Sequence, residues 1–175
     1  MRGTPTVRSP FARLVAVATA AAALSSAGWV SPASAHVATD ARAQRRHVID
    51  RARSQIGTPY SYGSESPRSG FDCSGLMYWA FKNHGDTLPR SSSDMWRLRK
   101  KNAYKRVWSK KNLHKGDLLF FNTSGGGVSH VGMYIGNKKM VHTGSSGGRV
   151  RKDYITESYY RARYVGAVRV PVLRR

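Results

Sequence analysis

The pattern of apolar positions predicts a helix in the first part of the chain. Between about Ala41 and Ile56, apolar residues recur at intervals of three, four and seven, which is the spacing of an amphipathic helix. Gly57 and Pro59 follow, and both residue types end helices. We therefore expect one face of this helix to pack against a core.

A second helix is predicted after a loop rich in glycine, serine, proline and tyrosine. It should begin at Asp72 or Cys73 and end at Gly85, because glycine is common directly after a helix. The side chains expected to face inward are those of Leu76, Trp79 and Ala80.

The second half of the chain has the alternating pattern of β-strands. Apolar and polar residues alternate there with a period of two, and glycine-rich turns separate the segments. Because helices come first and an antiparallel sheet second, the sequence predicts an α+β fold in one domain. The expected strands cover residues 118–121, 128–135, 139–143 and 164–172.

The first 35 residues have the features of a secretory signal peptide. Basic residues precede an apolar run over residues 14–24, and Ala33-Ser34-Ala35 has the small-residue spacing of a signal-peptidase site. The run is about half as long as a membrane-spanning helix, so we expect no transmembrane segment. The predicted organisation is a signal peptide in residues 1–35, a polar mature N-terminus in 36–45 and one folded domain in 46–175 of a secreted protein.

The chain is strongly basic, with a formal net charge of +21. Residues 1–35 contain three arginines and no acid, so the charge falls from +21 to about +18 without them. Such an excess favours anionic partners, such as wall polymers, lipid headgroups or nucleic acid. Charge alone does not choose among these partners, and a solvated basic face that only aids solubility is the alternative. A stretch rich in lysine and arginine, 97–111, also contains Tyr104 and Trp108.

The chain contains a single cysteine, Cys73. Exported proteins usually pair their cysteines, so a lone thiol is buried, intermolecular or reactive. At the start of a helix, unpaired N–H groups and the helix dipole favour the thiolate and lower the pKa of the thiol. Cys73 is therefore a candidate nucleophile, and the alternative is a small buried hydrophobic residue.

A thiol nucleophile needs a base and a group that orients the base. Among the six histidines, His130 and His142 lie in predicted strands that a turn at Gly136-Asn137 joins. The two imidazoles share a face of the sheet only if the hairpin loop has an odd length or contains a bulge. We expect one of these, which places His142 opposite Gly132 and diagonal to His130. Otherwise His142 is an ordinary sheet histidine.

Metal ligation is a rival use of the histidines. However, the sequence has no His-Glu-x-x-His helix, no Cys-x-x-Cys pair and no acidic cluster beside them. We therefore expect neither a catalytic metal nor a cofactor.

Six short segments occur along the chain in this order: Gly57-Thr58-Pro59-Tyr60, Phe71-Asp72-Cys73-Ser74-Gly75-Leu76, Leu88-Pro89-Arg90, Gly116-Asp117-Leu118-Leu119-Phe120-Phe121, His130-Val131-Gly132-Met133-Tyr134-Ile135-Gly136 and Val141-His142. Together they closely resemble the NlpC-type cell-wall peptidases, a papain-like family, over about Arg46 to Val172. One such segment is weak evidence, but six in order are specific. The hairpin lacks the second glycine that many relatives carry at its turn, which leaves the turn type open.

This resemblance implies a papain-like fold, in which the cysteine-bearing helix packs on the antiparallel sheet that supplies the histidine. It assigns Cys73 as nucleophile, His130 as base and His142 as the residue that orients the base. It also implies a peptidoglycan endopeptidase that cleaves stem peptides. The bond typically cut joins the γ-carboxyl of D-glutamate to a diamino acid.

The resemblance extends to residues that meet the substrate. Tyr60 matches a tyrosine of the family's active site whose hydroxyl helps to hold the oxyanion. Asp72 and Ser74 match residues that contact the stem peptide, and helix capping is an equally good explanation for both. Arg90 is a candidate for a substrate carboxylate, with an exposed arginine as the alternative.

Two other functions fit the same sequence. One is a non-catalytic basic module that binds wall polymer or nucleic acid, although a secretion signal argues against nucleic acid as a partner. The other is a papain-like amidase or acyl transferase with the same nucleophile. We expect a monomer that is associated with the bacterial cell wall, acts on peptidoglycan stem peptides and contacts anionic wall polymers through its basic surface.

Overall fold

The structure, a computed structural model, describes residues 32–82, 84, 87–98 and 104–171, with side chains from residue 40 onward. Most of the expected signal peptide lies outside the described residues, and so does Gly85, the expected end of the second helix. The signal peptide stays a prediction.

The first helix, α1 (Pro32–Ser54), begins at Pro32 rather than near Ala41. α1 therefore continues through the segment expected as a polar N-terminus. No helix among the described residues is both long and apolar enough to cross a bilayer. The α1 residues that enter the core are Val48, Ile49 and Ala52.

The second helix, α2 (Cys73–Phe81), starts where the sequence predicts. Asp72 is its N-cap, and its carboxylate accepts a hydrogen bond from the Gly75 N–H at 2.6 Å. The helix ends earlier than expected, because Lys82 already has a non-helical conformation. Leu76 and Ala80 are buried as predicted, together with Met77 and Phe81, whereas Trp79 is only partly buried.

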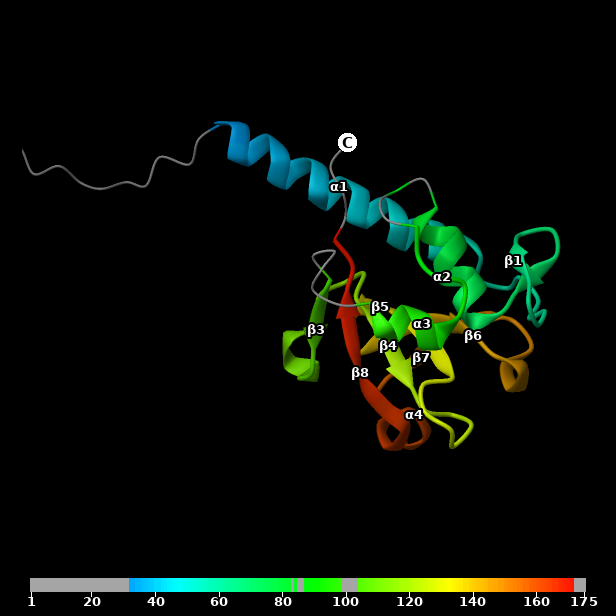
Figure 1. Ribbon diagram of the computed structural model, residues 1–175. Coiled ribbons are helices and arrows are strands. Elements are labelled where there is room, and N and C mark those ends of the chain that lie inside the picture. Colours follow the sequence, from blue (N-terminus) through cyan, green and yellow to red (C-terminus); the bar gives the residue numbers. More distant parts are fainter. Residues whose placement is uncertain (1–31, 83, 85–86, 99–103, 172–175) are drawn as a thin grey trace, which may run out of the picture. The chain divides into compact units, whose positions relative to one another are not determined.

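A six-stranded antiparallel sheet follows, with the strand order β3-β8-β4-β5-β6-β7 (Figure 1). The predicted α+β fold is confirmed. The sequence predicts four of these strands and misses β3 and β7. The strands are β3 (Lys105–Val107), β4 (Leu118–Phe121), β5 (His130–Gly136), β6 (Lys139–Thr143), β7 (Val150–Tyr154) and β8 (Tyr164–Arg169), and a separate ribbon pairs β1 (Glu65–Ser66) with β2 (Gly70–Phe71).

The two faces of the sheet carry separate cores. On one face, α1 and α2 pack against residues that include Phe120 and Val131. On the other face, α4 (Ser158–Arg163) contributes Tyr160 to a second cluster with Phe121 and Met140. Neighbouring residues of one strand therefore belong to different cores, as the pleat of a strand requires.

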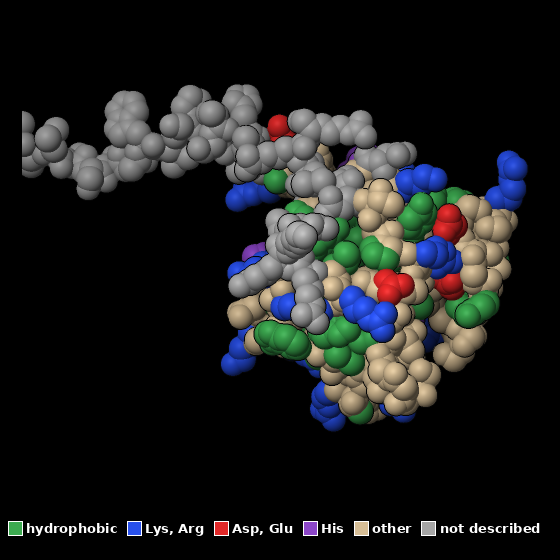
Figure 2. Space-filling model, viewed as in Figure 1, with side chains coloured by type: hydrophobic (Ala, Val, Ile, Leu, Met, Phe, Trp, Pro, Cys, Tyr) green, Lys and Arg blue, Asp and Glu red, His purple; other side chains and the backbone are tan. Residues whose placement is uncertain are grey.

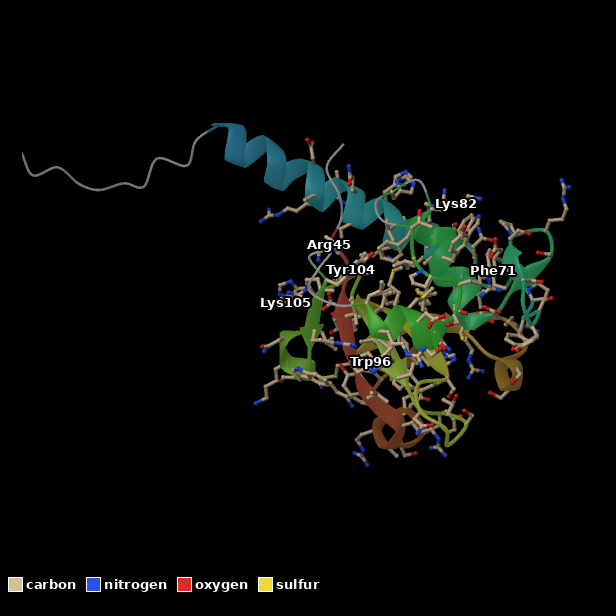
Figure 3. The ribbon with its side chains drawn as sticks, viewed as in Figure 1. Arg45, Phe71, Lys82, Trp96, Tyr104 and Lys105 are labelled. Atoms are coloured by element: carbon tan, nitrogen blue, oxygen red, sulfur yellow. The ribbon has the colours of Figure 1, made fainter. Side chains whose placement is uncertain are left out.

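A third short helix, α3 (Ser92–Arg97), lies on the same face as α2. It places the Trp96 ring against Phe120, with ring centroids 5.3 Å apart, and Figure 3 shows Trp96 between α3 and β8. Gly166 of β8 makes the space, because a Cβ atom there would come within 2.9 Å of the indole.

A buried ion pair fixes the start of β4. The Asp117 carboxylate is inaccessible to solvent and accepts hydrogen bonds from Arg169 Nε and from the His114 N–H, both at 2.8 Å. Arg169 is the last residue of β8, so the pair holds β4 beside β8. Removal of either partner would leave a costly uncompensated charge.

Candidate active site

Two cavities meet at Cys73, the first residue of α2. The smaller cavity, of about 150 Å³, is also lined by His130 and His142. The larger, of about 420 Å³, is lined by Asp72, Ser74 and Arg90 among others. Tyr60 and Ser129 line both. All seven residues that the sequence singles out therefore lie around one groove, with the thiol in the middle.

The electrostatics of Cys73 differ from the expectation. Burial raises the pKa of the thiol and outweighs the backbone N–H groups of Val131, Ser74 and Cys73 itself, which act to lower it. The charge of Asp72 adds to the rise. The prediction of a lowered pKa at this helix start is therefore wrong for the unliganded protein, where the neutral thiol is favoured. The same N–H groups nevertheless favour the thiolate.

His130 is the first residue of β5 and is buried. Its ring contacts Phe121, so it lies on the α4 side of the sheet, whereas Cys73 packs with the core on the α2 side. Both residues line the smaller cavity, which lies at the start of β5. Nε2 of His130 lies 3.0 Å from Nδ1 of His142, so Nδ1 is the ring nitrogen of His130 that this contact does not use.

The β5–β6 hairpin explains why the two histidines meet. Met133 pairs with Val141 and Tyr134 with Met140, but Gly136 pairs with Lys139, so that Ile135 forms a bulge. The bulge restores the register that the sequence analysis requires, with His142 opposite Gly132. A Cβ atom on Gly132 would lie 3.1 Å from the Cβ of His142, which confirms that the two positions are neighbours. The predicted irregularity in this hairpin is therefore confirmed.

The turn of the same hairpin is formed by Asn137 and Lys138. Their φ angles are 52° and 58°, so both residues are left-handed, as a type I′ turn requires. The sequence suggested Gly136-Asn137 as the turn, and the structure shifts it by one residue.

His142 is held from its far side by Asp153, a residue that the sequence analysis did not identify. Nε2 of His142 lies 3.0 Å from Oδ2 of Asp153. The Tyr160 hydroxyl and Nε of Arg151 donate to the same oxygen, both at 2.9 Å. The hydrogen bond from His142 is the main cause that holds the pKa of Asp153 far below its usual value, so this carboxylate is ionised.

An ionised Asp153 determines where the protons of the two imidazoles lie. A carboxylate only accepts, so His142 donates its Nε2–H and presents a lone pair at Nδ1. His130 then donates its Nε2–H to His142, and its own lone pair is at Nδ1. Burial and the neighbouring His142 lower the pKa of His130 to about 3, so this imidazole is neutral at ordinary pH, the state that a general base needs.

The wall of the larger cavity is a closed hydrogen-bond network. The guanidinium of Arg90 bonds both oxygens of Asp72, at 2.9 and 2.8 Å, and the hydroxyl of Ser74 at 3.0 Å. Its other donors bond Glu65 at 2.8 Å and the carbonyl of Ser64 at 3.2 Å. Although burial acts to raise it, the bonds from Arg90 and Gly75 hold the pKa of Asp72 below its usual value. Asp72 caps the helix and lines the cavity at the same time.

The sequence analysis missed Asp153, Arg151 and Tyr160 because their segments lack the usual patterns of a strand or a helix. Strand β7 reads Val-Arg-Lys-Asp-Tyr, with charged side chains on both faces and no apolar alternation. α4 is a single short helix that begins at Ser158 without a side-chain cap. The one available signal was the carboxylate of Asp153, in the strand that follows His142. This signal can be used only when the pairing of β6 with β7 is known.

Comparison with known proteins agrees with this geometry. A family model described as the NlpC/P60 family matches residues 57–169, which is more than half of the chain. The chain belongs to the NlpC/P60 family. The family resemblance seen in the sequence is thereby confirmed.

Relatives within the NlpC/P60 family differ in the bonds for which they are named. Murein DD-endopeptidase MepH of Escherichia coli is 40% identical over 125 residues, covering 70% of this chain and 45% of the relative. Gamma-DL-glutamyl hydrolase of Bacillus subtilis is 37% identical over 126 residues, covering 70% of this chain and 29% of the relative. The chain thus spans less than half the length of these two proteins.

Solved NlpC/P60 structures share the fold. The peptidoglycan hydrolase RipB of Mycobacterium tuberculosis superposes with a TM-score of 0.62 at 31% identity, covering 83% of this chain and 74% of RipB. An NlpC/P60 family protein of Bacillus cereus gives a TM-score of 0.64 at 33% identity, covering 73% of this chain and 40% of that protein.

Proposed function

We propose that this protein is a cysteine endopeptidase that cleaves the stem peptides of peptidoglycan, with Cys73 as nucleophile and His130 as base. The observation that carries the proposal is a hydrogen-bonded chain that starts at Asp153, passes through His142 and ends at His130, in the cavity that Cys73 also lines. Such a chain gives a base its orientation and tautomer. The names of the related proteins support peptidoglycan as the substrate.

The reaction follows from the placement of these groups. When the substrate carbonyl approaches the sulfur, the Cys73 thiol gives its proton to Nδ1 of His130 and the sulfur bonds to the carbonyl carbon. The carbon–nitrogen bond then breaks, and His130 returns the proton to the leaving amine. Water attacks the thioester, His130 accepts a proton from the water, and the acid leaves as Cys73 regains its proton.

Two kinds of donor are available for the oxyanion. The N–H groups of Cys73 and Ser74 lie at the start of α2 and act to favour the thiolate, and an oxyanion donor contributes roughly 3 to 4 kcal/mol in well-studied hydrolases. Tyr60 lines both cavities. Burial and the neighbouring Cys73 raise the pKa of Tyr60 above its usual value, so its hydroxyl keeps its proton and can donate.

The larger cavity suits the stem peptide. Arg90 uses all five of its N–H donors on Asp72, Ser74, Ser64 and Glu65, which favours a role in holding Asp72 and Ser74 over direct contact with a substrate carboxylate. Asp72 and Ser74 then present fixed polar groups beside the thiol. The bond we propose is the one between the γ-carboxyl of D-glutamate and the diamino acid. The name of the related gamma-DL-glutamyl hydrolase supports this bond, whereas the DD-endopeptidase name of MepH makes it a point to test.

The test is digestion of defined muropeptides, read by mass spectrometry. We expect the wild type to cut within the stem, and Cys73→Ala and His130→Ala to lose the activity while keeping their circular dichroism spectra. His114→Ala removes an exposed histidine and is the matched control. Undiminished cleavage by Cys73→Ala would overturn the nucleophile. A cut at muramic acid would instead indicate an amidase, and a peptide joined to a new amine would indicate a transferase.

We also propose export and attachment to the wall. The N-terminal residues direct secretion, and the mature chain begins near His36; N-terminal sequencing of the protein from the culture medium tests this. Figure 2 shows basic side chains spread over the visible surface and its margin. Exposed Lys105, Trp108 and Lys111 are candidates for contact with anionic wall polymer. Unchanged retention on walls stripped of these polymers would contradict this contact.

A further inference from the structure

The two cavities that meet at Cys73 differ in charge. In the larger cavity, the guanidinium of Arg90 is neutralised by Asp72 and Glu65, which it contacts directly. In the smaller cavity, Arg151 is the one lining residue among the described residues with a fixed charge. The rest of that wall consists of hydroxyl groups, histidines and the glycine-rich segment around η3 (Ser145–Gly147).

Arg151 is fixed in place on this wall. It pairs across the sheet with His142, and its Nε and Nη2 atoms contact Oδ2 of Asp153 at 2.9 and 2.8 Å. Its Nη1 atom lies against Gly147, where a Cβ atom would come within 2.6 Å of it. The absence of a side chain at Gly147 therefore leaves room for the guanidinium in this position, while 40% of the arginine side chain stays exposed.

The carboxylate of Asp153 forms an ion pair with this guanidinium from outside the cavity wall. Asp153 is not among the residues that line the cavity, and its Oδ2 is shared with the Tyr160 hydroxyl and with His142. The guanidinium of Arg151 is thus held through its Nε and Nη2 atoms, and its remaining edge is available to the cavity. Guanidinium groups bind carboxylates through charge-assisted hydrogen bonds, which are the strong ones.

We propose that Arg151 binds a free carboxylate of the stem peptide in the smaller cavity and so selects which stems are cleaved, an inference that rests on the proposed function. Stem peptides supply such a group close to the reacting bond. A D-glutamate linked through its γ-carboxyl keeps its α-carboxylate free, and a diamino acid that is also a dicarboxylic acid keeps a second one. The hydroxyls of Ser145, Ser146 and Tyr159 lie on the same wall and suit the remaining lone pairs.

Stems that differ by one carboxyl group test the proposal. Three stems are compared: one unmodified, one with the D-glutamyl α-carboxyl converted to the carboxamide, and one with the free carboxyl of the diamino acid converted. We expect one of the two conversions to lower kcat/KM of the wild type by about tenfold or more, as loss of a charge-assisted hydrogen bond does. In Arg151→Gln the same conversion should leave kcat/KM almost unchanged. The converted position identifies the residue that occupies the cavity.

Matched variants separate recognition from an effect on catalysis. Lys152→Gln removes an exposed charge from the same strand as Arg151 and should keep both rate and preference. If Arg151→Gln turns over too slowly, the preference among the three stems can be measured with Arg151→Lys. It can also be measured as stem affinity, with and without Arg151→Gln, in a Cys73→Ala background.

Two results would overturn the inference. They are a wild type that cleaves all three stems equally well, and a preference that persists in Arg151→Gln. A wild type that cleaves no stem at all would be a distinct outcome, and it would overturn the proposed function together with this inference.

Discussion

Asp153 and His142 form a diagonal pair across strands β6 and β7, with Oδ2 of Asp153 3.0 Å from Nε2 of His142. The pair fixes the direction of hydrogen bonding from Asp153 to His130, because the carboxylate accepts and each imidazole must then donate from Nε2. In this arrangement the negative charge of Asp153 is separated from His130 by His142. In the proposed mechanism, this charge stabilises the positive charge that His130 would acquire on taking the proton of Cys73.

Replacement of Asp153 by asparagine should therefore lower kcat. We expect a loss of about 10 to 100-fold, smaller than for a carboxylate that bonds the base directly, because His142 stands between them. The ¹⁵N chemical shifts of the imidazoles report the tautomers, and His142 should lose its fixed Nε2–H form. Asp50→Asn removes an exposed acid from α1 and is the matched control. An unchanged kcat with unchanged ¹⁵N chemical shifts would contradict a role for Asp153 in orienting His142.

The sequence predicts those residues of the site that lie in recognisable local patterns. Cys73 follows a capping aspartate at a helix start, and His130 and His142 lie in alternating strands. Asp153 and Arg151 lie in a strand of mostly charged residues, whose place at the edge of the sheet depends on long-range pairing with β6. No spacing in the sequence brings Asp153 next to His142.

The reactivity of Cys73 offers a direct test of its raised pKa. Because it is the single cysteine of the chain, the rate of alkylation by iodoacetamide reports on one thiol. Burial disfavours the thiolate, so the rate should keep rising with pH beyond about 8.5, the midpoint of an ordinary thiol. In denaturant the midpoint should return to the ordinary value. A plateau at neutral pH would show that a thiolate–imidazolium pair exists in the free enzyme.

The lowered pKa of His130 predicts how stability depends on pH. Unfolded His130 takes up a proton near pH 6.5, whereas folded His130 does so only near pH 3. As pH falls below 6.5, the unfolded state binds a proton that the folded state excludes, so the free energy of unfolding decreases. The slope is at most about 1.4 kcal/mol per pH unit, or about 2 kcal/mol by pH 5.

The variant His130→Gln isolates this contribution. It lacks the titrating group but keeps every other one, so its free energy of unfolding should fall less than that of the wild type between pH 7 and pH 5. Urea denaturation at each pH measures the difference. Parallel pH profiles for the two proteins would mean that His130 is not buried as a neutral imidazole.

The hairpin that joins β5 to β6 shows a similar division between what the sequence predicts and what it does not. The need to bring His130 and His142 to one face predicts an irregular register. It does not say whether the extra residue lies in the loop or in a strand, because either position brings the two histidines to the same face. The structure places the bulge at Ile135 and forms the turn from Asn137 and Lys138.

This turn leads to a prediction about stability. Lys138 has a φ of 58°, a left-handed conformation that costs a residue with a side chain roughly 1 to 2 kcal/mol. Lys138→Gly removes this strain but increases the freedom of the unfolded chain by about 0.5 to 1 kcal/mol, so a net gain of about 0.5 kcal/mol is expected. Thermal unfolding measures it as a small rise in Tm, with kcat unchanged because the turn is at the opposite end of the hairpin from His130. Lys139→Gly, at the first residue of β6, should lower Tm instead, because glycine loses more conformational freedom on folding and the contact of the lysine with the Tyr154 ring is lost. A lower Tm for both variants would show that the strain at Lys138 is too small to matter.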